Sequence, residues 1–160
     1  MITIQIVQDD SCNEALSHIM IATWRSGFRG ILEDSIIEQY TQFNGCKAMF
    51  SQIVSYGVGT MYLASLDNHP AGLLYWVAED GKARIEAILT IPEVWGKGVA
   101  AALMERALSD VKNAGCSSIQ VWPFAENHRA RHFYEKHGFS PSGKERVADA
   151  TEIEYCRQIN

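Results

Sequence analysis

A predicted strand that runs through two glycines directly into a predicted helix is the feature that most limits how this chain can fold. The segment reads Ile88-Leu-Thr-Ile-Pro-Glu-Val-Trp-Gly-Lys-Gly-Val-Ala-Ala-Ala-Leu103. Glycines allow a ligand to approach the backbone, and free N–H groups at a helix N-terminus attract anions. The pattern predicts a phosphate-binding loop at Gly96–Ala101, although two glycines also suit a plain tight turn.

The helix after this loop has a regular apolar face. Val99, Leu103, Ala107 and Val111 recur at every fourth position, and Gly115 follows as a stop signal. This spacing predicts an amphipathic helix over Gly96–Ala114 that packs on a sheet.

Most of the remaining apolar segments alternate like strands. Asp80-Gly81 is a strong hairpin turn between the predicted strands Ala71–Ala78 and Ala83–Ile91. The other predicted strands are Ile2–Val7, Thr60–Leu66, Ser118–Trp122, Phe139–Val147 and Thr151–Ile159.

Further helices are expected between these strands. Ser11-Cys-Asn-Glu14 fits a capping box for a helix that ends near Trp24, and two more helices are expected over Asn44–Gly57 and Asn127–His137. The aromatic and glycine-containing segment Trp24–Asp34 is either a loop that lines a cavity or a plain connection between helices. The element order predicts an α/β (α+β) fold with a mixed sheet and helices on both faces.

Length and composition favour one globular domain. The chain has 160 residues, of which 47% are hydrophobic and 21% charged, and we expect a single domain over 1–160. It has no apolar run long enough to span a membrane and no recognisable signal peptide, so we expect a cytoplasmic protein with no membrane partner.

Charge limits the class of partner. The net charge of −5 argues against nucleic acid as a partner. Residues 1–80 hold three basic and nine acidic side chains, whereas residues 81–160 hold eleven and ten. Anionic ligands should therefore prefer the second half and cationic ligands the first.

Two segments at a characteristic spacing resemble the GNAT superfamily of acetyl-CoA-dependent N-acetyltransferases. The first reads Pro92…Trp95-Gly-Lys-Gly98-Val-Ala100, and the second reads Asn127…Ala130…Phe133-Tyr-Glu135…Gly138-Phe139. The stronger part of the resemblance covers about residues 83–140. It implies a single GNAT-like domain with a central, mostly antiparallel sheet of six to seven strands.

The resemblance also implies roles for individual residues. Backbone groups of Ile88, Leu89 and Thr90 would lie along the pantetheine arm of acetyl-CoA, and Asn127 would steady the coenzyme. Tyr134 would stand near its sulfur. The loop that would hold the diphosphate comprises Gly96, Lys97, Gly98, Val99, Ala100 and Ala101. Trp95 departs from the family pattern, which has Gln or Arg there, so one polar contact to the phosphates is missing or replaced.

The chemistry of amide formation suggests two catalytic groups. An alkyl ammonium has a pKa of about 10.4, so a base must help to remove its proton, and an acid helps the thiolate to leave. Tyr134 is the candidate acid, against a packing role. Glu86 is the candidate base because strand alternation places it on one face with Ile88 and Thr90, although pairing with Arg84 is as plausible. A strand N–H would stabilise the developing oxyanion.

Other functions are also compatible with this sequence. A non-catalytic acyl-CoA sensor would keep the same loop, and Gly96–Ala101 also fits the dinucleotide-binding pattern, although no acidic residue ends the next strand. We expect the acceptor to be a primary amine of a small molecule or peptide, more cationic than anionic, with Glu33 and Asp34 as contacts or as plain helix caps. We expect no metal site, and a homodimer is compatible with the sequence.

Overall fold

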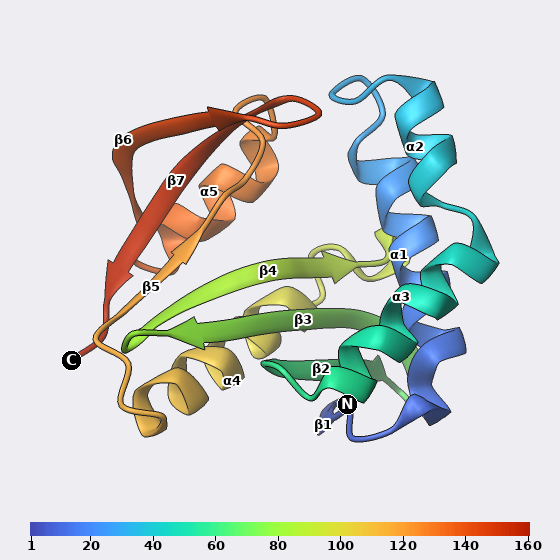
Figure 1. Ribbon diagram of the computed structural model, residues 1–160, viewed down its shortest axis with the longest axis horizontal. Helices are drawn as coiled ribbons and strands as arrows, with labels where there is room; N and C mark the ends of the chain where they lie inside the picture. Colours follow the sequence, from blue (N-terminus) through green and yellow to red (C-terminus); the bar gives the residue numbers. More distant parts are fainter.

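The computed structural model describes residues 1–160 and contains one seven-stranded sheet in the order β1-β2-β3-β4-β5-β7-β6 (Figure 1). The strands are β1 (Ile2–Ile6), β2 (Thr60–Leu66), β3 (His69–Glu79), β4 (Lys82–Thr90), β5 (Ser118–Val121), β6 (Ser140–Val147) and β7 (Thr151–Gln158). Only β4 and β5 pair in parallel. The expected mixed, mostly antiparallel sheet is confirmed.

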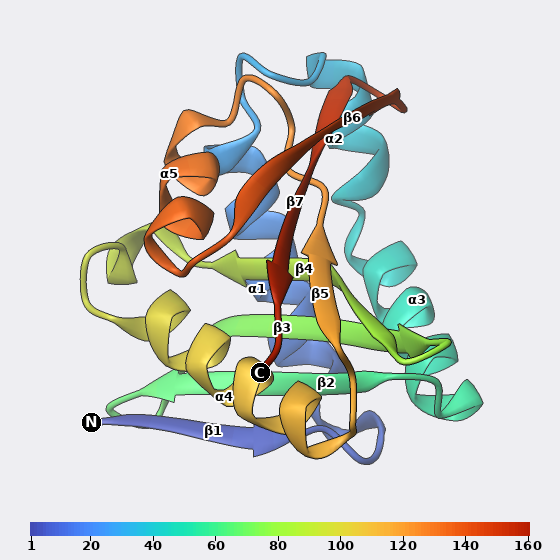
Figure 2. The ribbon, with the colours of Figure 1, turned by 90° about the vertical axis from the view of Figure 1, so that its left-hand side faces the viewer.

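Helices cover both faces of the sheet, as expected. They are α1 (Asn13–Gly27), α2 (Asp34–Tyr40), α3 (Phe43–Tyr56), α4 (Val99–Asn113) and α5 (His128–Lys136). One apolar cluster joins α1 and α3 to β2–β4, and a larger cluster joins α4 and α5 to the opposite face. Figures 1 and 2 show these two layers, with α1–α3 on one side of the sheet and α4 and α5 on the other. None of these helices combines the length and apolar character that a membrane span requires.

The predicted capping box at Ser11 and Glu14 is wrong. The Asp9 carboxylate accepts a hydrogen bond from the Ser11 backbone N–H at 3.0 Å, and residues Asp10–Cys12 form a short 3-10 helix before α1 begins at Asn13. Asp9 therefore caps the 3-10 turn, and Ser11 lies inside that turn instead of at the start of the α-helix. Helix α1 also continues beyond Trp24 to Gly27.

The end of α3 follows the sequence prediction. Gly57 adopts φ +64°, and its N–H donates to the Ile53 carbonyl. This left-handed position closes the helix, as the glycine suggested. Helix α4 has the predicted buried face of Val99, Leu103, Ala107 and Val111. It begins at Val99, however, and not at Gly96 as predicted.

A β-bulge interrupts β4 at Glu86. Ala87 pairs with Tyr75 and Ile85 pairs with Trp76, so Glu86 has no partner in β3. Ile85 packs in the cluster under α4, whereas Ala87 packs in the cluster under α1 and α3. The alternation from which the sequence analysis placed Glu86 does not run through this residue, because an extra residue in one strand changes where the following side chains point.

Strands β4 and β5 separate after a short parallel pairing. Their register runs from Lys82 opposite Ser118 to Ile85 opposite Val121, and β4 then continues alone on this side to Thr90. Figure 1 shows β5, β7 and β6 turning away from β4. The free side of β4 faces the opening between the two parts of the sheet.

A buried polar contact joins α4 to the sheet. The Tyr62 hydroxyl donates to Asp110 Oδ2 at 2.7 Å and accepts from Trp76 Nε1 at 2.9 Å. Arg106 lies over the Tyr62 ring and its Nε is 3.0 Å from the same Asp110 oxygen. These contacts fix the orientation of α4, whose N-terminus forms part of the site described next.

Candidate active site

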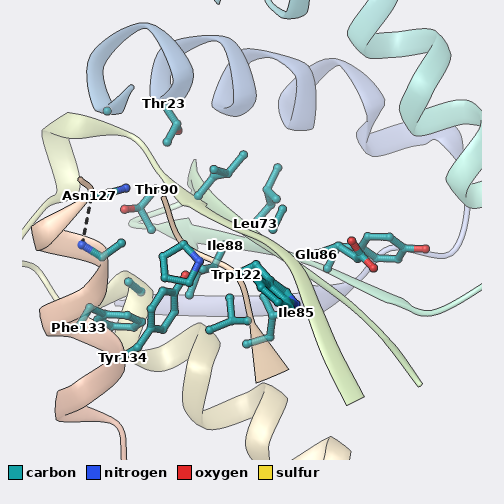
Figure 3. A pocket seen from close by; sticks show the side chains of 18 of the residues that line it. Thr23, Leu73, Ile85, Glu86, Ile88, Thr90, Trp122, Asn127, Phe133 and Tyr134 are labelled. Carbon is teal, nitrogen blue, oxygen red and sulfur yellow. Dashed lines mark hydrogen bonds between the residues drawn. The ribbon is translucent and has the colours of Figure 1, made fainter. Parts of the chain in front are cut away.

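A cavity of about 1010 Å³ lies where β4 and β5 separate. Its walls come from β4, the loop before α4, α5, the end of α1 and the segment after β5. Figure 3 shows side chains from α5 on one side of this cavity and Glu86 of β4 at the other. A volume of this size is typical of sites for sizeable organic ligands.

The loop before α4 offers unpaired N–H groups to this cavity. Gly96 and Gly98 have φ values of +79° and +86°, which side chains rarely adopt. The loop N–H groups that donate to no backbone carbonyl are those of Gly96, Gly98, Val99, Ala100 and Ala101. All of these residues line the cavity. Unpaired N–H groups at a helix N-terminus suit an anionic ligand such as a diphosphate.

Lys97 differs from the rest of the predicted loop. Its N–H donates to the Val94 carbonyl at 3.0 Å, and the residue does not line the cavity. The N–H that the sequence analysis assigned to the phosphates is therefore already engaged.

The three predicted pantetheine contacts, Ile88, Leu89 and Thr90, all line the cavity on the free part of β4. The Thr90 carbonyl already accepts one hydrogen bond, from Trp95 Nε1 at 3.0 Å. Strand N–H and carbonyl groups next to a cavity can hydrogen-bond an extended amide-containing chain.

Asn127 occupies the N-cap of α5. Its Oδ1 accepts from the Ala130 N–H at 3.2 Å, and the residue lines the cavity (Figure 3). The side-chain carbonyl is thus used within the helix, while the Nδ2 group makes no hydrogen bond in the chain.

Tyr134 is buried on α5 and lines the same cavity. Its ring packs near those of Phe139 and Tyr155, with centroid separations of 5.8 and 6.2 Å. The hydroxyl has no hydrogen-bond partner in the chain, and it is not sealed from solvent, since the only fully buried unpaired side-chain polar atom is Asn13 Oδ1. Burial raises the pKa of Tyr134 above its ordinary value, so the phenol remains protonated at neutral pH.

Glu86 lines the far part of the cavity and pairs with Arg84. Arg84 Nε lies 2.6 Å from Glu86 Oε1, and the Glu86 side chain is 39% exposed. The structure thus contains the alternative contact that the sequence analysis considered. The second carboxylate oxygen, Oε2, makes no hydrogen bond in the chain.

The end of α1 and the segment after β5 together form an apolar wall. Trp24, Phe28 and Phe124 line the cavity as a chain of rings, with Phe28 at 5.1 Å from each of the other two. Glu33 and Asp34 do not line it, and Asp34 lies instead in the first turn of α2. Residues 1–80 carry more acidic than basic side chains, but none of their carboxylates lines this cavity.

Sequence reasoning missed several charged residues at the cavity, among them Arg129, Arg146 and Glu152. Arg146 lies 4.3 Å over the Trp122 ring and 2.7 Å from Glu152 Oε1, and the Glu152 side chain is only 15% exposed. Arg129 lies 3.5 Å over the Trp95 ring. The contact of Arg146 with Trp122 joins segments that are distant in sequence, whereas Arg146 and Glu152 face each other across the β6–β7 hairpin. Arg129 falls within the second motif, where its charge was a usable signal.

The family model for the acetyltransferase (GNAT) family matches residues 18–139, about three quarters of the chain. The chain belongs to the GNAT family. It is therefore an acyl-CoA-dependent acetyltransferase, and the resemblance inferred from the two motifs is confirmed.

Individual N-acetyltransferases are similar to this chain in sequence or in fold. The chain is 27% identical over 121 residues to an uncharacterized N-acetyltransferase of Archaeoglobus fulgidus, covering 71% of this chain and 80% of the relative. It is 24% identical over 125 residues to a probable N-acetyltransferase of Mycobacterium tuberculosis, covering 76% and 70%. The PaiA N-acetyltransferase of Thermoplasma acidophilum, solved in complex with coenzyme A, superposes with a TM-score of 0.83 at 18% identity, covering 98% of this chain and 99% of that one.

The family and the sheet topology exclude the dinucleotide-binding alternative. A doubly wound dinucleotide fold needs two halves of parallel strands, whereas this GNAT sheet has a single parallel pair, β4 with β5. The glycines that fit the dinucleotide pattern belong instead to the loop before α4.

Proposed function

We propose that this protein transfers the acetyl group of acetyl-CoA directly to a primary amine of a small molecule or peptide, in a ternary complex. The observation that carries the proposal is the continuous path formed by the free part of β4 and the unpaired N–H groups of the loop at Gly96–Ala101. It offers strand hydrogen bonds for a pantetheine arm and an anion site for a diphosphate at its end.

The residues at the cavity supply the chemistry of this transfer. The amine nitrogen forms a bond to the thioester carbonyl carbon, and the bond from that carbon to sulfur breaks. Glu86 Oε2 takes a proton from the amine, directly or through water, and a β4 N–H donates to the carbonyl oxygen as it becomes negative. Tyr134 gives its hydroxyl proton to the departing thiolate and regains a proton from solvent.

Arg84 is consistent with this role for Glu86. The ion pair holds the carboxylate in one orientation while leaving Oε2 free. Glu152 is a less accessible carboxylate at the cavity, and its pairing with Arg146 joins β6 to β7. We therefore assign the base to Glu86 and a supporting role to Glu152.

The wall of the cavity that comes from α1 and the segment after β5 consists of aromatic rings. Trp24, Phe28 and Phe124 form an apolar wall, and the carboxylates at the cavity, Glu86, Asp149 and Glu152, come from β4 and the β6–β7 hairpin. Aromatic faces attract both flat apolar groups and cations. We infer an amine that carries an apolar or aromatic group, and this replaces the expectation of contacts from Glu33 and Asp34.

An amine panel tests the proposal. Thiol release from acetyl-CoA is measured with phenylethylamine, a polyamine, an amino acid, a short peptide and matching alcohols. We expect release only with amines, fastest with the arylalkyl amine, and initial-velocity lines that intersect as a ternary complex requires. Release with alcohols alone would contradict N-acetylation. Tight binding of acetyl-CoA with no release in any combination would favour the non-catalytic sensor.

A further inference from the structure

Trp95 connects the end of β4 to the anion-binding loop. Its Nε1 donates to the Thr90 carbonyl at 3.0 Å, and its backbone directly precedes Gly96. The indole is therefore fixed between the strand that would hold the pantetheine arm and the N–H groups that would hold the diphosphate. An indole has no further polar group to offer to a phosphate.

Arg129 stacks on this indole. Its guanidinium carbon lies 3.5 Å from the centre of the Trp95 ring, within the range of a favourable cation–π contact. Arg129 forms no ion pair or hydrogen bond within the chain, and it lines the cavity together with Gly96 and Gly98. Its N–H donors remain available, whereas those of Arg84, Arg106 and Arg146 are engaged by carboxylates.

We propose that Arg129, held flat on Trp95, binds the diphosphate of the coenzyme and supplies the polar contact that the residue at position 95 does not. This inference rests on the proposed function. A guanidinium matches phosphoryl oxygens with two parallel hydrogen bonds. Stacking restricts the side chain before the ligand arrives, so less conformational entropy is lost on binding.

The first test compares coenzyme affinities by calorimetry. We expect Arg129→Ala to weaken CoA binding about tenfold, the lower part of the range for a charge-assisted contact, because the site is partly open to solvent. Arg129→Lys should recover part of this loss. Lys112→Ala is the matched control: it removes the same charge from the last turn of α4, at the opposite end of the helix from the loop, and should leave affinity unchanged.

Dephospho-CoA identifies which phosphate is bound, because it lacks the ribose 3′-phosphate but keeps the diphosphate. The proposal predicts the same loss for Arg129→Ala with both ligands. A loss seen with CoA and absent with dephospho-CoA would overturn the assignment to the diphosphate.

A double-mutant cycle tests the part played by Trp95. If the indole holds Arg129, then Arg129→Ala should cost clearly less affinity in a Trp95→Leu protein than in the wild type. Additive losses would overturn the coupling. Unchanged CoA affinity in folded Arg129→Ala, alongside wild-type turnover, would overturn the inference and leave the proposed function intact. Failure of the wild type to bind acetyl-CoA would instead contradict the proposed function.

Discussion

Arg84 Nε lies 2.6 Å from Glu86 Oε1, at the residue where β4 bulges beside the cavity. This ion pair occupies one of the two carboxylate oxygens of Glu86, Oε1. If Glu86 is the base, as proposed, it must act through Oε2, and Arg84 is then a positioning residue that keeps the carboxylate in place.

Glu86→Gln keeps the size of the side chain but removes the proton acceptor. We expect kcat/KM for the amine to fall about 10²-fold near neutral pH, the lower end for general-base help. The loss should shrink as pH approaches the pKa of the amine, because more of the free amine is then present. Glu152→Gln serves as the comparison, and a larger loss in that variant would move the base from β4 to β7.

Gly98→Asp tests the anion-binding loop. The substitution places a carboxylate next to unpaired N–H groups, at a φ of +86°, and should abolish acetyl-CoA binding in calorimetry. Gly115→Asp is a matched control, since Gly115 has φ +82° with open space around it and follows the other end of α4. Equal loss of binding in both variants would attribute the effect to backbone strain and not to the loop.

The pH dependence of turnover tests the state of Tyr134. Burial raises the pKa of Tyr134, and an acid must be protonated to act, so activity is retained as pH rises and is lost only above that raised value. Since an ordinary tyrosine titrates near pH 10, kcat/KM should rise with pH as the amine becomes neutral and should show no descending limb below about pH 10. A descending limb near pH 8 that Tyr134→Phe removes would contradict the raised pKa.

Tyr62→Phe tests the contact that orients α4. The change leaves the buried Trp76 Nε1–H without its acceptor and removes the donor to Asp110, so the free energy of unfolding should fall by about 1–3 kcal/mol. Urea denaturation measures this loss. Tyr56→Phe, at a side chain that is 75% exposed, should change it by less than about 0.5 kcal/mol.

Local patterns predicted the elements that depend on local chemistry. Asp80 and Gly81 both adopt positive φ in the β3–β4 hairpin, as that dipeptide indicated. The spacing of Val99, Leu103 and Ala107 gave the buried face of α4. Two glycines before that helix were enough to indicate its unpaired N–H groups.

Contacts between distant segments were beyond such patterns. The bulge at Glu86 depends on how β3 pairs with β4, and it invalidates a face assignment made by simple alternation. The capping box failed for a local reason, because Asp9, two residues before Ser11, takes the Ser11 N–H. Glu152 reaches the cavity only because β7 lies beside β5, and nothing within its own strand distinguishes it from Glu154.

The most direct test of the account compares thiol release by the wild type and by folded Tyr134→Phe, with acetyl-CoA and the best amine of the panel. The ring still packs in the variant and only the hydroxyl is lost. We expect amine-dependent release by the wild type, a kcat lower by about 10²-fold or somewhat less in Tyr134→Phe, because a thiolate is already a good leaving group, and an unchanged Kd for acetyl-CoA. Wild-type kcat in the variant would return Tyr134 to a packing role, and absence of amine-dependent release by the wild type would contradict the proposed transfer.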